Sequence, residues 1–230
     1  MKILAVDSSA KACSVAITDD NKILGSFFIN TALTHSQTLV PMIDSLMKTT
    51  GTKVESIDCF AVSAGPGSFT GVRIGVSAIK GIAMPLDALC ASVSTLEAMA
   101  YNMLDIDCVV CAVMDARRNQ VYNALFRISN GAVTRLCDDR ALSVDDLGDE
   151  LKSLNERIIL IGDGAELCYK SFKNININIS LAEESQRYQN AVGVAMASKD
   201  KELISASRLM PTYLRLPQAE RELKKKTEEK

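Results

Sequence analysis

Short apolar segments separated by polar turns fill the first half of the chain. Runs rich in β-branched and other apolar residues predict strands at residues 3–6, 13–18, 23–29, 59–63 and 88–92. Apolar residues that recur with a 3.6-residue period predict amphipathic helices at residues 35–50, 70–83 and 95–102. The predicted order is therefore three strands, a helix, a strand, a helix, a strand and a helix. Pro41 means that the first helix either begins or kinks there, and Gly51 is its expected C-cap.

The second half shows the same pattern. Strands are predicted at residues 108–114, 120–127, 132–136 and 157–161, and a helix at residues 144–154 with Ser143 as its N-cap. Asp115-Ala116-Arg117 takes the place of Asp7-Ser8-Ser9, and Gly162-Asp163-Gly164 that of Gly65-Pro66-Gly67. Two such halves are the layout of the ribonuclease-H-like, actin-like ATPase architecture.

We therefore predict an α/β fold with two similar subdomains, at residues 1–103 and 104–216. Residues 217–230 are rich in charge and are expected to form a solvated helix or a disordered tail. The apolar run near the N-terminus is too short to be the core of a signal peptide. No apolar run in the sequence approaches the length of a membrane-spanning helix. Seven cysteines within apolar segments are typical of reduced thiols in a cytoplasmic protein.

The composition removes several functions. Lys and Arg number 26 against 28 Asp and Glu, which excludes a strongly basic nucleic-acid clamp. Aromatic residues make up 5%, too few for a binder built on stacked bases. His35 is the only histidine, so the chain cannot form a metalloprotease site with two histidines. We expect His35 to make a local hydrogen bond.

The glycine-rich segment at residues 65–71 is the strongest motif. Gly65, Gly67 and Ser68 precede a helix N-terminus, whose free N–H groups favour anions. The segment has no Gly-Lys-Ser/Thr and is not a P-loop. It is either a cradle for phosphate or carboxylate or a tight turn that packing requires.

The segment Asp7-Ser8-Ser9 has two interpretations as well. It could hold a metal-bound phosphate, or it could be a strand-end turn, which we favour. Arg117 and Arg118 could contact phosphate or simply be solvated. On the helix at residues 70–83, small residues at helical spacing permit close approach of a neighbour. That neighbour is either the chain's own sheet or another subunit.

Several segments together resemble the TsaB (YeaZ) family, which is related to the TsaD or glycoprotease superfamily. They are residues 3–9, Thr34-His35-Ser36, residues 65–75, residues 114–118 and Pro211-Thr212-Tyr213-Leu214-Arg215. The resemblance implies an actin-like (ASKHA) fold and a role in making N6-threonylcarbamoyladenosine at position 37 of ANN-decoding tRNAs. It also implies a non-catalytic subunit that pairs with a TsaD-like catalytic subunit and is joined by a TsaE-like ATPase.

TsaD-like proteins hold their metal with a His-x-x-x-His pair. In the equivalent segment of this chain, Thr95 and Met99 stand where those histidines would fall. Neither is a good ligand for a Zn²⁺- or Fe²⁺-type ion. We therefore expect no metal site, no catalytic residues and no protease activity.

The family resemblance also implies that the first two helices bind the partner. The residues assigned to that surface are Leu39, Ile43, Leu46, Met47, Gly71, Ile74, Gly75, Ala78, Ile79 and Ile82. The same surface could form a homodimer when the partner is absent. We expect tRNA contact only through the complex, no membrane contact and no firmly bound cofactor, with ATP or ADP conceivable at the partner interface.

Two enzymatic alternatives stay open at this point. The first is an ATP-binding or phosphoryl-transfer enzyme that uses Asp7, Ser8, Ser9 and the loop at residues 65–71. The second is a nuclease that uses Asp7, Asp58 and Asp115; it is disfavoured because Asp58 precedes its strand.

Overall fold

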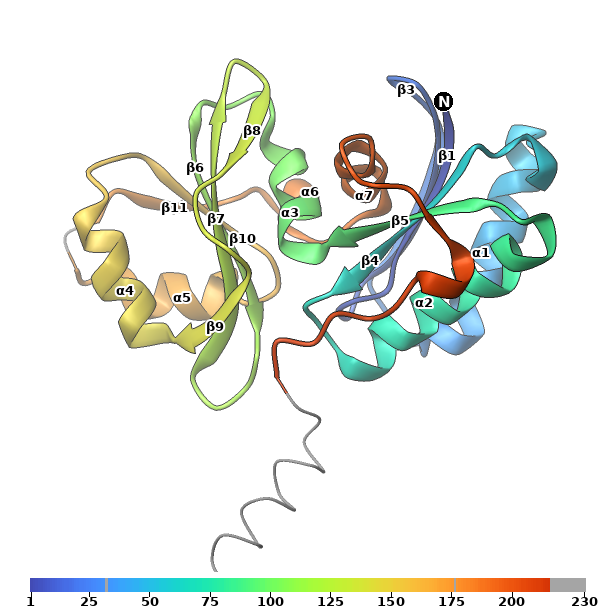
Figure 1. Cartoon of the computed structure of the whole chain (residues 1–230). Coiled ribbons are helices and arrows are strands. Elements are labelled where there is room, and N and C mark those ends of the chain that lie inside the picture. The colour runs from blue at the N-terminus through green and yellow to red at the C-terminus, as the bar shows by residue number, and fades with distance from the viewer. Residues whose placement is uncertain (32, 176, 216–230) are drawn as a thin grey trace, which may run out of the picture.

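The computed structural model describes residues 1–31, 33–175 and 177–215. The predicted tail at residues 217–230 lies outside these described residues. Within these described residues, two β-sheets and the helices that cover them make up the fold (Figure 1).

The first sheet has six strands in the order β12-β5-β4-β1-β2-β3. Their bounds are β1 (Lys2–Asp7), β2 (Cys13–Asp19), β3 (Lys22–Ile29), β4 (Cys59–Gly65), β5 (Leu89–Ser94) and β12 (Ile204–Ser205). Strands β1, β2 and β3 pair antiparallel, whereas β1, β4 and β5 pair parallel. The five strands predicted in the first half are thus confirmed.

Two helices cover the outer face of this sheet, α1 (His35–Thr50) and α2 (Phe69–Ala83). Helix α1 begins at His35 and runs through Pro41, so the proline does not start it. It ends at Gly51, whose φ of 64° confirms the predicted C-cap. Short 3-10 turns follow at Val54–Ser56 and Met84–Leu86.

The second sheet has the order β11-β10-β6-β7-β8, and β9 pairs with β7. The strands are β6 (Cys108–Asp115), β7 (Gln120–Ser129), β8 (Ala132–Arg135), β9 (Arg140–Ser143), β10 (Ile158–Ile161) and β11 (Ile179–Leu181). Helices α4 (Val144–Ser153) and α5 (Ala165–Phe172) pack on its outer face. Ser143 caps α4 as predicted, because its hydroxyl accepts from the N–H of Asp146.

The two sheets share one topology. The strand order β3-β2-β1-β4-β5 in the first corresponds to β8-β7-β6-β10-β11 in the second. In both, the central strand pairs antiparallel with the next strand and parallel with the strand after the first helix. The internal repeat predicted from the sequence is therefore confirmed, and β9, α5 and β11 are additions that were not predicted.

Helices α3 (Thr95–Ala100) and α7 (Ala191–Ser198) lie between the sheets (Figure 1). Leu96 and Met99 of α3 belong to the core of the second sheet, whereas Val194 and Ala195 of α7 belong to the core of the first. Strand β12 also pairs with β5 of the first sheet. Packing thus crosses the predicted boundary at residue 103, since residues 191–205 return to the first half. The remaining elements are α6 (Glu184–Arg187) and 3-10 turns at Tyr101–Met103 and Ala206–Arg208.

Candidate functional site

The turn after β1 packs directly on the start of α2. The Ser8 hydroxyl donates to the carbonyl oxygen of Gly71 at 2.9 Å, and the N–H of Ser68 donates to that of Ser9 at 2.6 Å. A Cβ atom at Gly75 would lie 2.6 Å from the Ser8 Oγ, a distance that real Cβ atoms do not adopt. The close approach that the glycines permit is therefore to the chain's own β1–β2 loop. Of the two interpretations, the one in which these small residues pack within the chain fits this contact.

Asp7 is enclosed by this arrangement, with a side chain that is 1% exposed. One carboxylate oxygen accepts from the Ser9 N–H at 2.9 Å and the Ser9 hydroxyl at 2.7 Å, and the other accepts from the Ser63 hydroxyl at 2.5 Å. Burial raises the pKa of Asp7, although these hydrogen bonds and the nearby His35 oppose the rise. The carboxylate is used within the turn, as expected for the strand-end interpretation.

The loop of residues 65–71 is also engaged with its own neighbours. The Ser68 hydroxyl accepts from the N–H of Gly71 at 3.2 Å and so caps α2. Gly65 has a φ of 121°, and its Cα lies so close to the carbonyl group of Thr212 that a Cβ atom would clash with that oxygen. The N–H groups of Ser68 and Gly71 are thus both occupied. The predicted contact of an anion with Gly65, Gly67 or Ser68 remains a prediction. Such an anion could not bind to the N–H groups of Ser68 and Gly71, because both already donate within the chain.

His35 makes a hydrogen bond, as predicted, but its partner lies 25 residues earlier in the chain. Its Nε2 lies 2.6 Å from the carbonyl oxygen of Ala10. It therefore ties the first residue of α1 to the same β1–β2 loop.

Most of the residues predicted to bind a partner face inward. Those buried in the first half of the chain are Leu39, Ile43, Leu46, Gly71, Gly75 and Ile79. This corrects their assignment to a docking surface, because an amphipathic helix turns its apolar stripe to its own sheet first. The other four, Met47, Ile74, Ala78 and Ile82, are partly exposed at the rim of that core.

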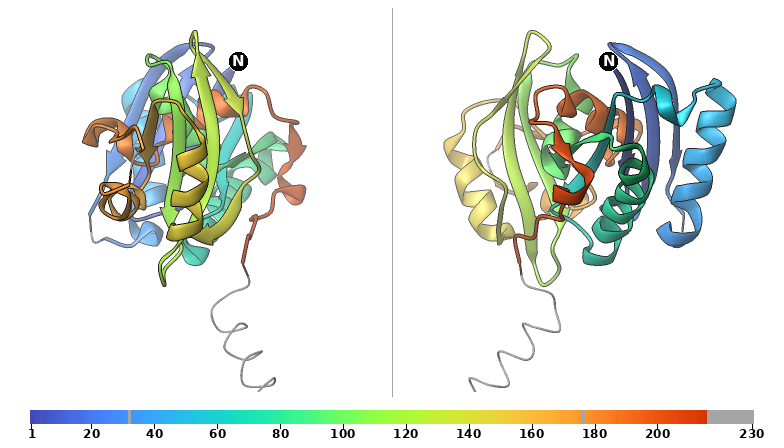
Figure 2. Two further views of the ribbon diagram at one scale, coloured as in Figure 1. Left: turned by 90° about the vertical axis from the view of Figure 1, so that its left-hand side faces the viewer. Right: turned by 45° about the vertical axis from the view of Figure 1, so that its right-hand side comes forward.

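Two exposed apolar side chains that the sequence analysis did not assign to a partner also lie on these helices or next to them. Val40 is 54% exposed on α1, and Met84 is 56% exposed just after α2. Together with Ile74, Ala78 and Ile82 they form what we call the outer helix face. Figure 2 shows α1 and α2 side by side on the outside of the first sheet.

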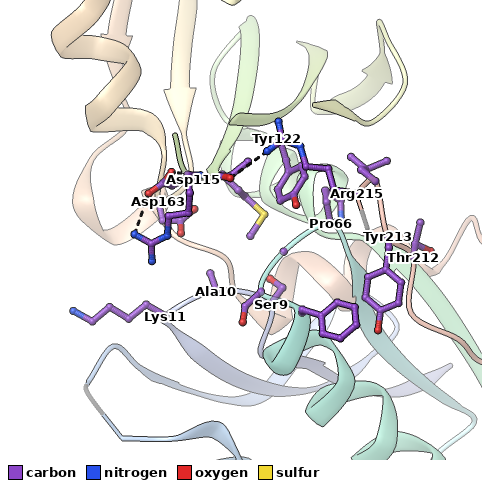
Figure 3. Close-up of a pocket in the computed structure, with 17 residues that line it drawn as sticks. Ser9, Ala10, Lys11, Pro66, Asp115, Tyr122, Asp163, Thr212, Tyr213 and Arg215 are labelled. Atoms are coloured by element: carbon purple, nitrogen blue, oxygen red, sulfur yellow. Dashed lines mark hydrogen bonds and ion pairs between the residues drawn. The ribbon is translucent and has the colours of Figure 1, made fainter. Parts of the chain in front are cut away.

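A cleft of about 520 Å³ lies between the two halves. It is lined by Ser9, Ala10 and Lys11 from the first half and by Asp115, Tyr122 and Asp163 from the second, with residues 212–215 along one side (Figure 3). Of the six residues predicted to contact a nucleotide or anion, Ser9, Gly67 and Ser68 line this cleft, whereas Asp7, Ser8 and Gly65 are not among its lining residues. No role was predicted for Lys11, Tyr122, Tyr213 or Arg215, although Pro211–Arg215 was one of the segments that carried the family resemblance.

Charges of both signs meet at one end of the cleft. Arg117 lies 3.5 Å from the carboxylate of Asp115, and the Gln189 amide donates to the carboxylate of Asp163 at 3.3 Å. Desolvation raises the pKa of Asp163, and the hydrogen bond from Gln189 opposes that rise. Arg117 and Arg118 are exposed and adopt positive φ angles of 66° and 57° at the tip of the β6–β7 turn. The cleft therefore offers both acceptors and cations to a small polar molecule.

The residues at the metal position of the TsaD-like pattern are buried. Thr95 and Met99 are each 0% exposed, and neither supplies a nitrogen or carboxylate oxygen. Among the described residues no group of three His, Cys, Asp or Glu could hold a metal ion. These side chains do not fit the implied metal.

The nuclease interpretation is wrong on geometry. Asp58 accepts from the N–H of Lys2 at 2.6 Å, at the start of β1, whereas Asp7 lies at its end. A six-residue strand separates the two carboxylates, roughly 16 Å at about 3.3 Å per residue. The three predicted acids do not meet.

Within the described ranges, no helix has the length and apolar character needed to span a membrane.

A family model described as "TsaD: tRNA N6-adenosine threonylcarbamoyltransferase" matches residues 23–222. The tRNA threonylcarbamoyladenosine biosynthesis protein TsaB of Bacillus subtilis is 29% identical over 96% of both chains. The Escherichia coli protein of the same name is 33% identical over 71% of this chain and 72% of its own.

Solved structures agree. A YeaZ-like protein from Pseudomonas aeruginosa superposes with a TM-score of 0.80 at 25% identity, covering 93% of this chain and 99% of that one. The activator of 2-hydroxyisocaproyl-CoA dehydratase from Clostridium difficile matches with a TM-score of 0.50 at 12% identity, covering 87% and 95%. The second likeness concerns the fold alone and confirms the predicted actin-like class. The chain thus belongs to the TsaB (YeaZ) family.

Proposed function

We propose that this chain is a non-catalytic scaffold and activating subunit of the complex that makes N6-threonylcarbamoyladenosine at position 37 of ANN-decoding tRNAs. The observation that carries the proposal is the combination of TsaB family membership with buried Thr95 and Met99 at the metal position. A TsaD-like subunit supplies the metal and the chemistry. This chain has no protease or transferase activity on its own.

The outer helix face is the surface on which the TsaD-like subunit docks. Val40 on α1 and Met84 just after α2 are more than half exposed, and Ile74, Ala78 and Ile82 are partly exposed on α2. Exposed apolar residues gathered on one face are typical of an interface. Without the partner, the same face pairs with a second copy of this chain. A TsaE-like ATPase joins the complex, tRNA is contacted only through it, and the complex works in the cytoplasm.

The test is a binding measurement with purified TsaD-like subunit. Val40→Glu places a charge on the α1 side of the proposed interface and is expected to weaken binding at least tenfold, with an unchanged melting temperature. Leu167→Glu is the matched control, because Leu167 is 37% exposed on α5 of the second half. Equal binding by the wild type and Val40→Glu would remove the outer helix face from the proposal. No binding by the wild type, or modification that persists without this chain, would remove the proposal itself.

The alternative is an ATP-binding or phosphoryl-transfer enzyme, and the observation in its favour is the open cleft beside Ser9 and Asp115. Calorimetry of the isolated chain with ATP and Mg²⁺ separates the two functions. The scaffold proposal expects no heat of binding without the partner, since any ATP or ADP would bind at the partner interface. Magnesium-dependent binding by the isolated chain would favour the enzyme.

A further inference from the structure

The segment that follows β12 runs along one side of α2. The ammonium group of Lys80 on α2 donates to the carbonyl oxygens of Ser207 and Leu209, both at 3.1 Å. Leu209 is fully buried in the core of the first half. Further on, the N–H of Thr212 donates to the carbonyl oxygen of Ala64, at the end of β4, at 2.7 Å. The segment is thus fixed to the first half at three points.

A stack of three side chains adds a fourth point. The rings of Tyr213 and Phe69 are stacked with centroids 4.6 Å apart, and the Arg73 guanidinium lies 3.7 Å from the centroid of Phe69. The Arg73 Nε donates to the Tyr213 hydroxyl at 2.7 Å. Phe69 and Arg73 are one turn apart on α2, so Tyr213 is clamped against the first turns of that helix.

The next residues reach the second half of the molecule. Arg215 donates to the carbonyl oxygen of Ala116 at 3.2 Å and to the side chain of Gln120, and its guanidinium lies 5.6 Å from the ring of Tyr122. Ala116 and Gln120 close the β6–β7 turn through their own backbone hydrogen bond. One segment therefore connects α2 to the β6–β7 turn of the second sheet across the cleft (Figure 3).

We propose that residues 207–215 are a strap that sets the position of α2 relative to the second half, and that partner binding at the outer helix face depends on this strap. The dependence on the partner rests on the proposed function. Helix α2 lies between α1, which packs on one side, and the strap, which contacts Phe69, Arg73 and Lys80. Its remaining side carries Ile74, Ala78 and Ile82 of the outer helix face. Releasing the strap leaves that face less ordered before binding, and lost preorganisation lowers affinity.

Arg215 is the positioning residue of the strap, because it touches the second half and not the outer helix face. Arg215→Ala removes the far anchor and deletes no atom that takes part in the contacts of Thr212 and Tyr213. Tyr213→Phe keeps the ring stack and removes only the hydroxyl that accepts from Arg73. Met210→Ala is the matched control, since Met210 belongs to the same segment and its side chain is 63% exposed.

Two readouts test the strap. Hydrogen exchange of the Thr212 N–H should become faster in Arg215→Ala, although the bond from Thr212 to Ala64 lies three residues away. Affinity for the TsaD-like subunit should fall about tenfold, within the usual range of coupling between distant sites. Tyr213→Phe should give a smaller fall, and Met210→Ala none. Melting temperatures checked in parallel show whether each variant is folded.

Each outcome decides one point. Unchanged exchange at Thr212 in Arg215→Ala overturns the strap as a connected unit. Faster exchange with unchanged affinity overturns its link to the partner. If the wild type itself does not bind the TsaD-like subunit, the proposed function fails, while the exchange measurement still decides whether residues 207–215 act as one strap.

Discussion

At the scale of single residues, Asp7 shows how a position that could serve catalysis is used for structure. Its carboxylate follows the central strand of the first sheet but accepts three hydrogen bonds from Ser9 and Ser63. With a side chain 1% exposed, it has little access to a ligand in the cleft. The cost of burying the charge raises its pKa from an ordinary value of 3.8.

This raised pKa predicts how stability depends on pH. The folded state binds the proton of Asp7 more readily than the unfolded state. The contribution of Asp7 to the free energy of unfolding therefore falls as the pH rises from about 4 through the raised pKa. Asp7→Asn carries no such charge. Urea unfolding of both proteins between pH 4 and 7 should show the wild type losing stability relative to the variant, by at most about 1.4 kcal/mol per pH unit. A constant difference over that range would contradict the burial of a charged Asp7.

At the scale of elements, α2 is held by how closely it approaches the loop after β1. Gly71 and Gly75 sit over Ser8, and Gly75 also faces Val62 of β4. A third glycine of the same helix, Gly81, is exposed and has nothing within 4 Å of where a Cβ would lie. The same residue type thus has opposite roles on the two sides of one helix.

Two alanine substitutions in α2 should therefore change stability in opposite directions. Gly75→Ala forces Ser8 or Val62 to move and should lower the free energy of unfolding by about 1–3 kcal/mol. Gly81→Ala should raise it by roughly 0.5–1 kcal/mol, because alanine restricts the unfolded chain and favours the helix. Thermal and urea unfolding measure both values. Equal effects of the two substitutions would mean that α2 is not seated on the loop.

At the scale of the whole molecule, an ionic network between the sheets joins segments far apart in the sequence. Glu97 of α3 accepts from Arg135 of β8 at 3.2 Å and from Lys201, which follows α7, at 2.7 Å. Arg135 also donates to Asp139 at 2.6 Å and lies over the ring of Phe126. The two carboxylates are only 16% and 17% exposed, so they depend on these partners.

Removing the shared cation should therefore matter more than removing a surface pair. Arg135→Met leaves Glu97 and Asp139 short of a partner, and we expect a loss of about 1.5–3 kcal/mol in the free energy of unfolding. Arg127→Met is the control: its pair with Glu156 is 45% and 42% exposed and is worth roughly 1 kcal/mol or less. Urea unfolding of the two variants checks this order. A smaller loss for Arg135→Met than for Arg127→Met would contradict the network.

The strands and helices of the first half, the strands β6, β7, β8 and β10, helix α4 and the internal repeat could be predicted because each depends on local periodicity, whereas β9 and the elements after Ile161 were not predicted. What the apolar face of a helix packs against could not be predicted in this way. The spacing of Leu39, Ile43 and Leu46 identifies an apolar stripe but does not say whether it covers the chain's own sheet or a partner. The family resemblance suggested the partner, and packing on the first sheet prevailed.

The strap could not be predicted for a different reason. Residues 207–215 have no hydrophobic period, and each of their contacts joins positions that are far apart in the sequence, such as Tyr213 with Arg73 and Arg215 with Ala116. Only part of the site could therefore be predicted. Ser9 follows a strand and Asp115 ends one, in segments whose turn residues indicate a possible site. Tyr213 and Arg215 were indicated only by the Pro211–Arg215 motif.

The exchange of α3 and α7 between the sheets has a consequence for how the protein is made. The first sheet needs residues 191–205 to cover its inner face and to pair with β5, although its other strands are complete by Ser94. On the ribosome, that face must wait for about a hundred further residues before it is covered. During that interval the nascent chain exposes Ile3, Ala5 and Ala61, an apolar surface open to aggregation or to a chaperone. The N-terminal half is therefore expected to be a dependent fragment, finished only when nearly the whole chain has been synthesised.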